Sequence, residues 1–440
     1  MATTDSAAQT TKPLFPRLSG GPRRMPANRV AEHQKARLEG AMVEAVARHG
    51  YAGTTLRELV ALAGVSKTTF YEHFESKQDC FLATFDEIVN VLSARVGQAW
   101  RTDGDFRERL VAALSAFMNL AVEEPNAAAL AAVESLTLGA AGVAHRERAS
   151  AAFETLVQQS FDHAPSPHEV SPVVVRAIVA GIRGVAYRRL RTGRAQELPE
   201  LVEPLIDWAL RYQLPENETL RRAILAAETP SGATLEREDE KPDWEEPPDS
   251  ALSKTTLTQR ERIVRAAARV VVERGYDALS IPAISAAAGT SNQTFYEHFS
   301  SKRDAFLAAF EIIAGEAFAF AFSAFEAAAD GPEAIGAGLR GLTEHISNHR
   351  IFARLAFFEL PTAGPAALDR ADAIMDSFTA FLGPELSPTG IGKPGSPAVL
   401  EAVGTGIWSV IQHEIAHDRA DSLPELAPEL ARIALAPLAD

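Results

Sequence analysis

Residues 69–74 read TFYEHF, and residues 294–299 read TFYEHF again. The two copies lie 225 positions apart, and the pair Gly50-Tyr51 matches Gly275-Tyr276 at the same offset without a gap. A period this long excludes a solenoid of short repeats and indicates two tandem domains of roughly 190 residues each. The fold of the chain therefore follows from one unit that occurs twice.

The same offset returns near the ends of the two copies, where Gly181-Ile182 matches Gly406-Ile407. Identity at both ends indicates that the whole unit was duplicated. Between the copies, residues 214–255 are acidic and rich in Pro, Gly and Ser, which predicts a mostly disordered linker.

The composition is typical of a soluble globular protein, because 46% of the 440 residues are hydrophobic and 23% are charged. The single cysteine, Cys80, excludes an internal disulfide. No run reaches the ~18 to 20 consecutive apolar residues of a membrane span, and residues 1–21 lack the apolar core of a signal peptide. These features predict a cytoplasmic location.

The formal net charge of −15 argues against a protein that coats nucleic acid indiscriminately, because phosphate binding requires Lys and Arg. Residues 12–77 and 254–303 are nevertheless basic islands in this acidic chain. A disordered basic tail is expected over residues 1–28. Its Arg17, Arg23 and Arg24 are consistent with an arm that reaches the DNA minor groove and equally with a solvated tail.

Both copies predict an all-α fold, since long runs rich in Ala, Leu, Glu and Arg carry apolar residues three and four apart. Gly64 and Gly289 suit left-handed caps that end a short second helix, and Ser66 and Ser291 suit the N-cap of a third. The first two helices are expected at 30–49 and 56–63, and at 257–274 and 281–288. Helix, glycine turn and helix form the helix-turn-helix layout.

The residues around this turn closely resemble the signature of the tetracycline-repressor-like (TetR) family. In the first copy they are Ala63-Gly64-Val65-Ser66, Phe70-Tyr71, His73-Phe74, Ser76-Lys77 and Asp79, and the second copy matches equally well. The resemblance implies two TetR-like units, each a three-helix DNA-binding domain followed by a helical effector-binding and dimerisation domain. The expected boundaries are 29–78 and 79–213 for the first unit, and 256–303 and 304–440 for the second.

The resemblance also implies a sequence-specific DNA-binding transcriptional regulator, with repression as the family default. A recognition helix presents polar side chains to base edges while its apolar side packs on the preceding helices. The expected DNA-binding residues of the first copy are Ser66, Lys67, Thr68, Thr69, Tyr71, His73 and Lys77. Those of the second copy are Ser291, Asn292, Gln293, Thr294, Tyr296, His298 and Lys302.

The two copies differ at two reading positions, where Lys67-Thr68 is replaced by Asn292-Gln293. Lys suits guanine acceptors, whereas Asn and Gln suit adenine. The sequence therefore predicts an operator that is an imperfect palindrome of two unlike half-sites.

Late helices at 170–191 with 200–212, and at 398–417 with 425–435, resemble the TetR dimerisation pair. Gly181 and Gly184, or Gly404 and Gly406, would allow close packing. Fusion favours an intramolecular pseudo-dimer, and a homodimer with four heads stays open.

The region between the head and the late helices of the second copy is rich in aromatics expected mostly in the core: Phe318, Phe320, Phe322, Phe325, Phe352, Phe357, Phe358, Phe378 and Phe381. In the family this region encloses an effector pocket, which makes a small apolar effector the expected partner besides double-stranded DNA.

The sequence leaves two alternative functions open. Residues 413–417 fit the HExxH pattern of a zinc-dependent hydrolase, with Glu425 or Glu429 as a third ligand. The equivalent first-copy residues are Arg188-Arg189-Leu190-Arg191-Thr192, so no enzyme activity, cofactor or metal is expected. The other rival is an interaction protein with a degenerate DNA-binding head, against which Lys77, Lys302, Tyr71 and Tyr296 argue.

Overall fold

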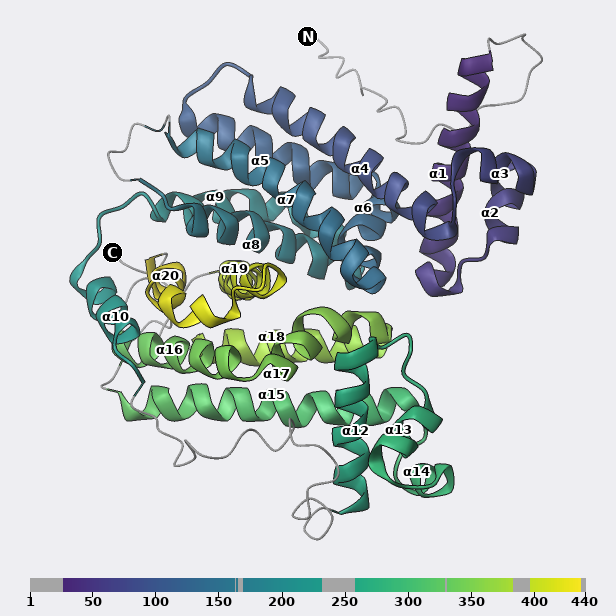
Figure 1. Cartoon of the computed structure of the whole chain (residues 1–440). Coiled ribbons are helices and arrows are strands. Elements are labelled where there is room, and N and C mark those ends of the chain that lie inside the picture. The colour runs from purple at the N-terminus through teal and green to yellow at the C-terminus, as the bar shows by residue number, and fades with distance from the viewer. Residues whose placement is uncertain are drawn as a thin grey trace. The chain divides into compact units, whose positions relative to one another are not determined.

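The computed structural model describes residues 27–162, 164, 169–231, 258–328, 331–382 and 396–436, all without a strand (Figure 1). The all-α prediction is confirmed. The tail with Arg17, Arg23 and Arg24, and the linker from residue 232 onward, lie outside the described residues. The chain divides into two compact units, one of residues 1–135 and 186–202, the other of residues 136–185 and 203–440.

The first unit is built on a three-helix head and the helices that follow it. Its helices are α1 (Ala27–Gly53), α2 (Leu56–Ala63), α3 (Lys67–His73), α4 (Lys77–Trp100), α5 (Phe106–Glu123) and α6 (Pro125–Ala132), with the 3₁₀ segment η2 (Ala195–Leu201) on α5. The α1 helix runs past its expected end, with a kink at Gly50, whose φ of 66° suits glycine. Leu38, Met42, Leu59 and Phe81 are fully buried and form the core between α1, α2 and α4.

The second unit contains the second head and most of the late helices of both copies. Its head is α12 (Gln259–Arg274), α13 (Ile281–Ala288) and α14 (Asn292–His298). The following helices are α15 (Lys302–Ala327), α16 (Pro332–Asn348), α17 (Arg350–Arg354), η3 (Leu355–Glu359), η4 (Leu360–Ala363), α18 (Pro365–Leu382), α19 (Pro397–Ala416), η5 (Ala420–Ser422) and α20 (Leu423–Leu435). From the first copy come α7 (Gly139–Asp162), α8 (Pro172–Arg191, through residue 185), α9 (Val202–Arg211) and α10 (Glu218–Glu228), while η1 (Glu134–Leu138) spans the division.

The α10 helix corrects the expectation of a linker from residue 214. Leu220, Ala223 and Ala227 are buried, and α10 packs on α16 and α20. A Cβ added to Gly336 of α16 would lie 2.1 Å from the Ala223 carbonyl oxygen, so the two helices approach backbone to backbone. Residues 218–228 are thus an ordered part of the second unit.

The α8 and α19 helices pack with the symmetry of the repeat. A Cβ added to Gly181 would lie 2.5 Å from the carbonyl oxygen of Ala402, and one added to Gly406 would lie 2.8 Å from that of Ala177. Gly181 and Gly406 are 225 positions apart, as are Ala177 and Ala402, so each copy makes the same contact with the other. This is the arrangement of an isologous interface. Gly184 also faces α19, at Thr405, whereas Gly404 faces α18 instead.

The aromatic residues of the second copy divide between core and surface. Phe352, Phe357 and Phe378 are buried, whereas Phe322 is 48% exposed and lies at the surface. The side chain of Phe381 lies outside the described residues. Among the described helices, α15 alone is long and apolar enough to cross a membrane, but it packs on α12 and α16 and buries Phe306, Phe310 and Ile313.

Candidate DNA interface

The first helix-turn-helix has the cap residues expected for it. Thr55 Oγ1 accepts from the backbone N–H of Glu58 and opens α2, which ends at Gly64 with a left-handed φ of 60°. Ser66 Oγ then accepts from the N–H of Thr69 at 3.0 Å and opens α3. Both predicted bounds of the second helix, 56 and 63, are confirmed.

The second helix-turn-helix repeats this geometry. Ser280 opens α13, Gly289 ends it with a φ of 62°, and Ser291 Oγ accepts from the N–H of Thr294 at 3.0 Å. Pro282 stands in the first turn of α13, where its missing N–H has no helical partner to lose. The predicted bounds 281 and 288 are confirmed as well.

The apolar side of each recognition helix anchors it to the head. Phe70 and Phe295 are fully buried, and Phe74 and Phe299 are 3% and 7% exposed. This fixes which side of α3 and α14 faces outward, because the helix turns about 100° per residue. Tyr71 and Tyr296 lie on that outward side, 53% and 60% exposed.

The polar residues at the helix starts fall into two groups. Ser66 and Thr69 hydrogen-bond each other through their hydroxyls at 3.0 Å, as do Ser291 and Thr294, so these four side chains shape the helix N-terminus. Lys67, Thr68, Asn292 and Gln293 are exposed instead. The ammonium of Lys67 lies 5.8 Å from the centre of the Tyr71 ring, a cation–π contact that steadies both side chains.

The two histidines of the repeated motif differ in their surroundings. His73 is half-buried, and its Nε2 lies 3.3 Å from Oε1 of Gln34 on α1. His298 is exposed. The first histidine is therefore held against α1, and the second has more surface to offer a ligand.

Lys77 and Lys302, which the sequence predicts to contact DNA, donate hydrogen bonds to backbone carbonyls of their own heads. Lys77 Nζ donates to the carbonyl oxygens of Tyr51 and Thr54 at 2.9 and 3.0 Å, and burial lowers the pKa of Lys77. Lys302 Nζ donates to the carbonyls of Tyr276 and Leu279 at 3.4 and 2.8 Å. Each lysine thereby ties the helix after the head to the end of the head's first helix.

A carboxylate from outside the head also holds that same turn in each copy. The N–H of Tyr51 donates to Glu134 Oε2 at 2.8 Å, and the N–H of Tyr276 donates to Glu359 Oε2 at 2.9 Å. Sequence reasoning missed both carboxylates. The signal was present, because Glu134 and Glu359 are 225 positions apart, like the tyrosines that they hold.

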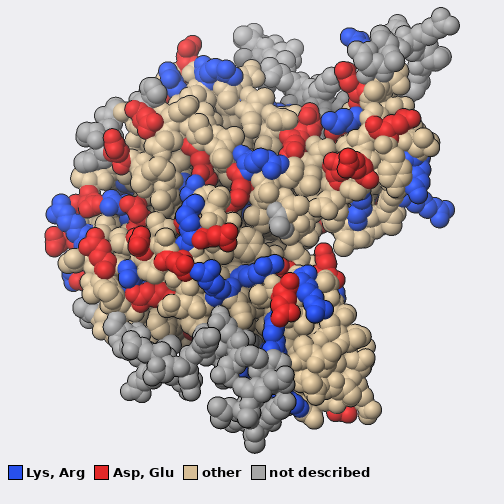
Figure 2. Space-filling model, in the orientation of Figure 1, with Lys and Arg blue, Asp and Glu red and all other residues tan. Residues whose placement is uncertain are grey.

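The two heads differ in surface charge. Arg57 and Lys67 are exposed in the first head, whereas the equivalent positions of the second hold Pro282 and Asn292. Figure 2 shows blue side chains along the outer edge of the first head and a largely uncharged face on the second. Because phosphate attraction depends on cations, α2 and α3 of the first head offer two cations that α13 and α14 of the second head lack.

The HExxH segment does not have the arrangement of a zinc hydrolase. Glu414, the general base of such a motif, forms two bonds with Arg419, at 2.6 and 2.9 Å, and is 9% exposed. Glu429 accepts from Ser171 Oγ at 3.1 Å and pairs with Arg432. The base and that suggested third ligand are thus engaged elsewhere.

Comparison with known proteins agrees with the head geometry. The family model described as bacterial regulatory proteins, tetR family, matches residues 40–84 and 263–309. The HTH-type transcriptional activator FasR of Mycolicibacterium smegmatis is 38% identical over 104 residues, which are 23% of this chain and 47% of that relative. The chain thus spans about half the length of this curated relative.

Solved structures of regulators also resemble parts of the chain. The fatty acid degradation regulator FadR from Bacillus halodurans is 17% identical, covers 40% of this chain and 96% of its own, and has a TM-score of 0.37. The transcriptional regulator FadR from Bacillus subtilis, solved in complex with stearoyl-CoA, is 16% identical, covers 39% of this chain and 96% of its own, and has a TM-score of 0.36.

Proposed function

The chain is a tandem member of the tetR family of bacterial regulatory proteins, and from this premise we propose that one polypeptide supplies both heads of a transcriptional regulator. The α8 and α19 helices form the pseudo-dimer interface, and the heads read the two unlike half-sites of an imperfect palindrome. The reciprocal contact of Gly181 with Ala402 and of Gly406 with Ala177 carries this proposal. A second chain could not pair through this surface, because α8 and α19 of one chain already cover each other.

The direct contacts to DNA are assigned to the exposed residues of α3 and α14. Lys67, Thr68 and Tyr71 serve the first half-site, and Asn292, Gln293, Tyr296 and His298 the second. The hydroxyls of Ser66, Thr69, Ser291 and Thr294 position these helices and remain candidates for phosphate contact. Lys77 and Lys302 support the heads from within.

We also propose repression, with release by a small apolar effector. Occupancy of an operator that overlaps a promoter blocks polymerase without any further contact. In the second copy, apolar side chains of α15, α16, α18 and α19, among them Phe310, Phe378 and Ile407, surround a void of about 20 Å³. Ligand pockets are ~300–1,000 Å³, so an effector would have to select a more open conformation.

The proposal is tested by counting chains on DNA. A duplex operator is first enriched from a random library with the full chain, and the free and bound masses are then measured by native mass spectrometry. One chain on one duplex with unlike half-sites is expected. Two chains per site would overturn the pseudo-dimer, and failure to enrich any duplex would overturn the regulator.

The direction of regulation needs a separate readout. A reporter driven by a promoter that overlaps the enriched operator is expected to fall when the chain is expressed. A rise in the reporter would instead assign activation, the role printed for FasR. Addition of medium-chain and long-chain fatty acids to the bound complex then tests for an apolar effector, and an unchanged complex with every ligand would remove it.

A further inference from the structure

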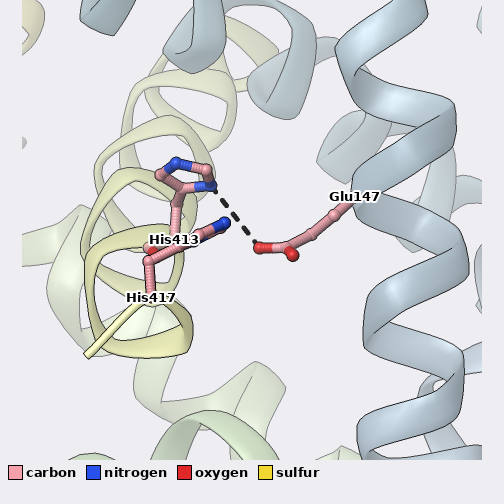
Figure 3. Close-up of side chains that lie close together, drawn as sticks. All are labelled: Glu147, His413 and His417. Carbon is pink, nitrogen blue, oxygen red and sulfur yellow. Dashed lines mark hydrogen bonds and ion pairs between the residues drawn. The ribbon is translucent and has the colours of Figure 1, made fainter. Parts of the chain in front are cut away.

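A cluster of three metal-ligating side chains lies between α7 and α19. Glu147 comes from α7, and His413 and His417 are four residues apart on one side of α19. One ligand atom from each residue lies within 4.8 Å of the others, and His413 Nδ1 is 3.5 Å from Glu147 Oε1. Figure 3 shows a nitrogen of both imidazoles turned toward the carboxylate.

The hydrogen bonds of the cluster leave a ligand atom free on His417. Its Nδ1 lies 2.8 Å from the His413 carbonyl oxygen, which can only accept, so Nδ1 carries the proton. The lone pair of His417 is therefore on Nε2. A backbone carbonyl that holds the far nitrogen in this way is the usual support of a metal-bound histidine.

The cluster opens into a cavity of about 400 Å³, which leaves room for a further ligand on the ion. In the wall, Arg176 bonds to Glu154 at 3.2 Å, and Arg183 bonds to Ser150 and Ser409. Since Arg146 and Arg148 line the same cavity, its walls carry more Arg than Glu. This surplus favours an anionic group, such as hydroxide or a small carboxylate, in the open coordination position.

The duplication offers two internal comparisons. The positions equivalent to Glu147, His413 and His417 hold Asp372, Arg188 and Thr192, so the set of three occurs at one place in the repeat. A second histidine pair, His345 and His349, has the same spacing, and His349 Nδ1 lies 2.7 Å from the His345 carbonyl oxygen. No carboxylate completes that pair within the described residues.

We propose that Glu147, His413 and His417 form a binding site for a divalent transition metal of the zinc class. Two histidines and one carboxylate with an open position are a ligand set that Zn²⁺ accepts. The ion would require ligand atoms ~3.3 Å apart, which small rotations of the exposed His417 and of Glu147 can supply. Since α7 belongs to the first copy and α19 to the second, the ion would fasten the two copies together.

The test measures metal binding by the full chain in the absence of DNA, so it does not depend on the proposed function. Chelator-treated protein is titrated with Zn²⁺ against a chromophoric competitor, and with Co²⁺ to observe the absorption bands of a four-coordinate ion. One equivalent is expected to bind. His417→Ala and Glu147→Gln are each expected to lower the affinity at least tenfold, whereas the matched variant His349→Ala leaves it unchanged.

Several outcomes would overturn the metal site. These are substoichiometric Zn²⁺ binding, equal loss in His349→Ala, or no loss in His417→Ala although that variant keeps its helical circular dichroism. Binding of inorganic phosphate without Zn²⁺ would assign the cavity to an anion instead. If the site holds, Zn²⁺ raises the unfolding midpoint of the wild-type chain and leaves that of His417→Ala unchanged.

Discussion

The backbone N–H of Tyr51 donates to the carboxylate of Glu134 at 2.8 Å, and in the second copy Tyr276 donates to Glu359 at 2.9 Å. Each tyrosine follows the glycine that ends or kinks the first helix of a head, Gly50 or Gly275. Its ring also packs 5.1 Å from that of Phe81 or Phe306. One carboxylate and one ring thus fasten each head to the helices that follow it.

Removal of this carboxylate is expected to loosen the attachment. A hydrogen bond to a charged acceptor contributes about 1.5–3 kcal/mol, so Glu134→Ala or Glu359→Ala should lower the free energy of unfolding by about 1–2 kcal/mol after allowance for partial exposure. Urea denaturation checks this. Glu326→Ala, at an exposed position of α15, is the control and should lie within about 0.5 kcal/mol of wild type. If the free energy of unfolding falls no more than in the control, the hydrogen bond to this carboxylate does not stabilise the fold.

The close approach of α8 and α19 predicts that a single methyl group is harmful there. Gly406→Ala places a Cβ 2.8 Å from the Ala177 carbonyl oxygen and is expected to cost about 1–3 kcal/mol in unfolding free energy. Gly315→Ala on α15 is the matched control, because nothing lies within 4 Å of its added Cβ. That control should gain about 0.5–1 kcal/mol from helix propensity. Equal results for both variants would contradict the packing.

The two heads carry different residues at the base-reading positions, so exchanging these residues is expected to change the preferred operator sequence. Lys67→Asn combined with Thr68→Gln gives the first head the residues of Asn292 and Gln293, so library selection should then enrich a more symmetric palindrome. The reciprocal change, Asn292→Lys with Gln293→Thr, should yield the other palindrome. If selection returns the wild-type operator in both cases, specificity does not reside in these positions.

The charge difference between the heads predicts unequal salt dependence. Arg57→Ala should weaken binding to all duplexes alike and reduce the slope of log affinity against log salt by about 1, as expected for the loss of one phosphate contact. Fluorescence anisotropy at several salt concentrations gives this slope. The control is Pro282→Ala at the equivalent position, where the slope should stay unchanged.

Glu39 predicts a pH-dependent stability. It is 5% exposed on α1, and burial raises its pKa to about 7 in spite of the attraction of Lys35. Because the folded state holds the proton more tightly than the unfolded chain, this stabilisation is complete below about pH 4.5 and is lost as the pH rises through about 7. Glu39→Gln should therefore raise the unfolding free energy by about 2–3 kcal/mol at pH 8 relative to its effect at pH 4.5.

The control for this pH effect is Glu75→Gln, at an exposed position. Its effect on stability should be the same at the two pH values. A Glu39→Gln profile parallel to that of wild type would show that the carboxyl is not held protonated. The second copy has Val264 at the equivalent position, 1% exposed, so this is a core position that the first copy fills with an ionisable group.

The helix-turn-helix could be predicted from sequence because its limits are local. Gly64 and Gly289 end their helices in the left-handed conformation that few other residues adopt, and Ser66 and Ser291 cap the next helix within three residues. The family signature then supplied the function class. Nothing beyond neighbouring residues was needed for either step.

The features that were missed depend on distant partners. The α10 helix lies among breakers and acidic residues, and its apolar side is meaningful only against α16 and α20. The ammonium of Lys77 donates to two carbonyls that are 23 and 26 residues away, a contact that the sequence alone does not indicate. The role of Glu134 was not predicted because its partner, Tyr51, lies 83 residues away in the sequence.

The contact of α8 with α19 inside one chain has a consequence for how the regulator responds to its own abundance. Two separate subunits must meet before they can occupy an operator, so their active fraction falls steeply when few copies are present. In the proposed pseudo-dimer, one polypeptide carries both halves and keeps its partner at every dilution, so its operator occupancy at low copy number rises in simple proportion to that number. Each half is also encoded separately, so on this proposal one head can acquire a new half-site while the other retains the old one.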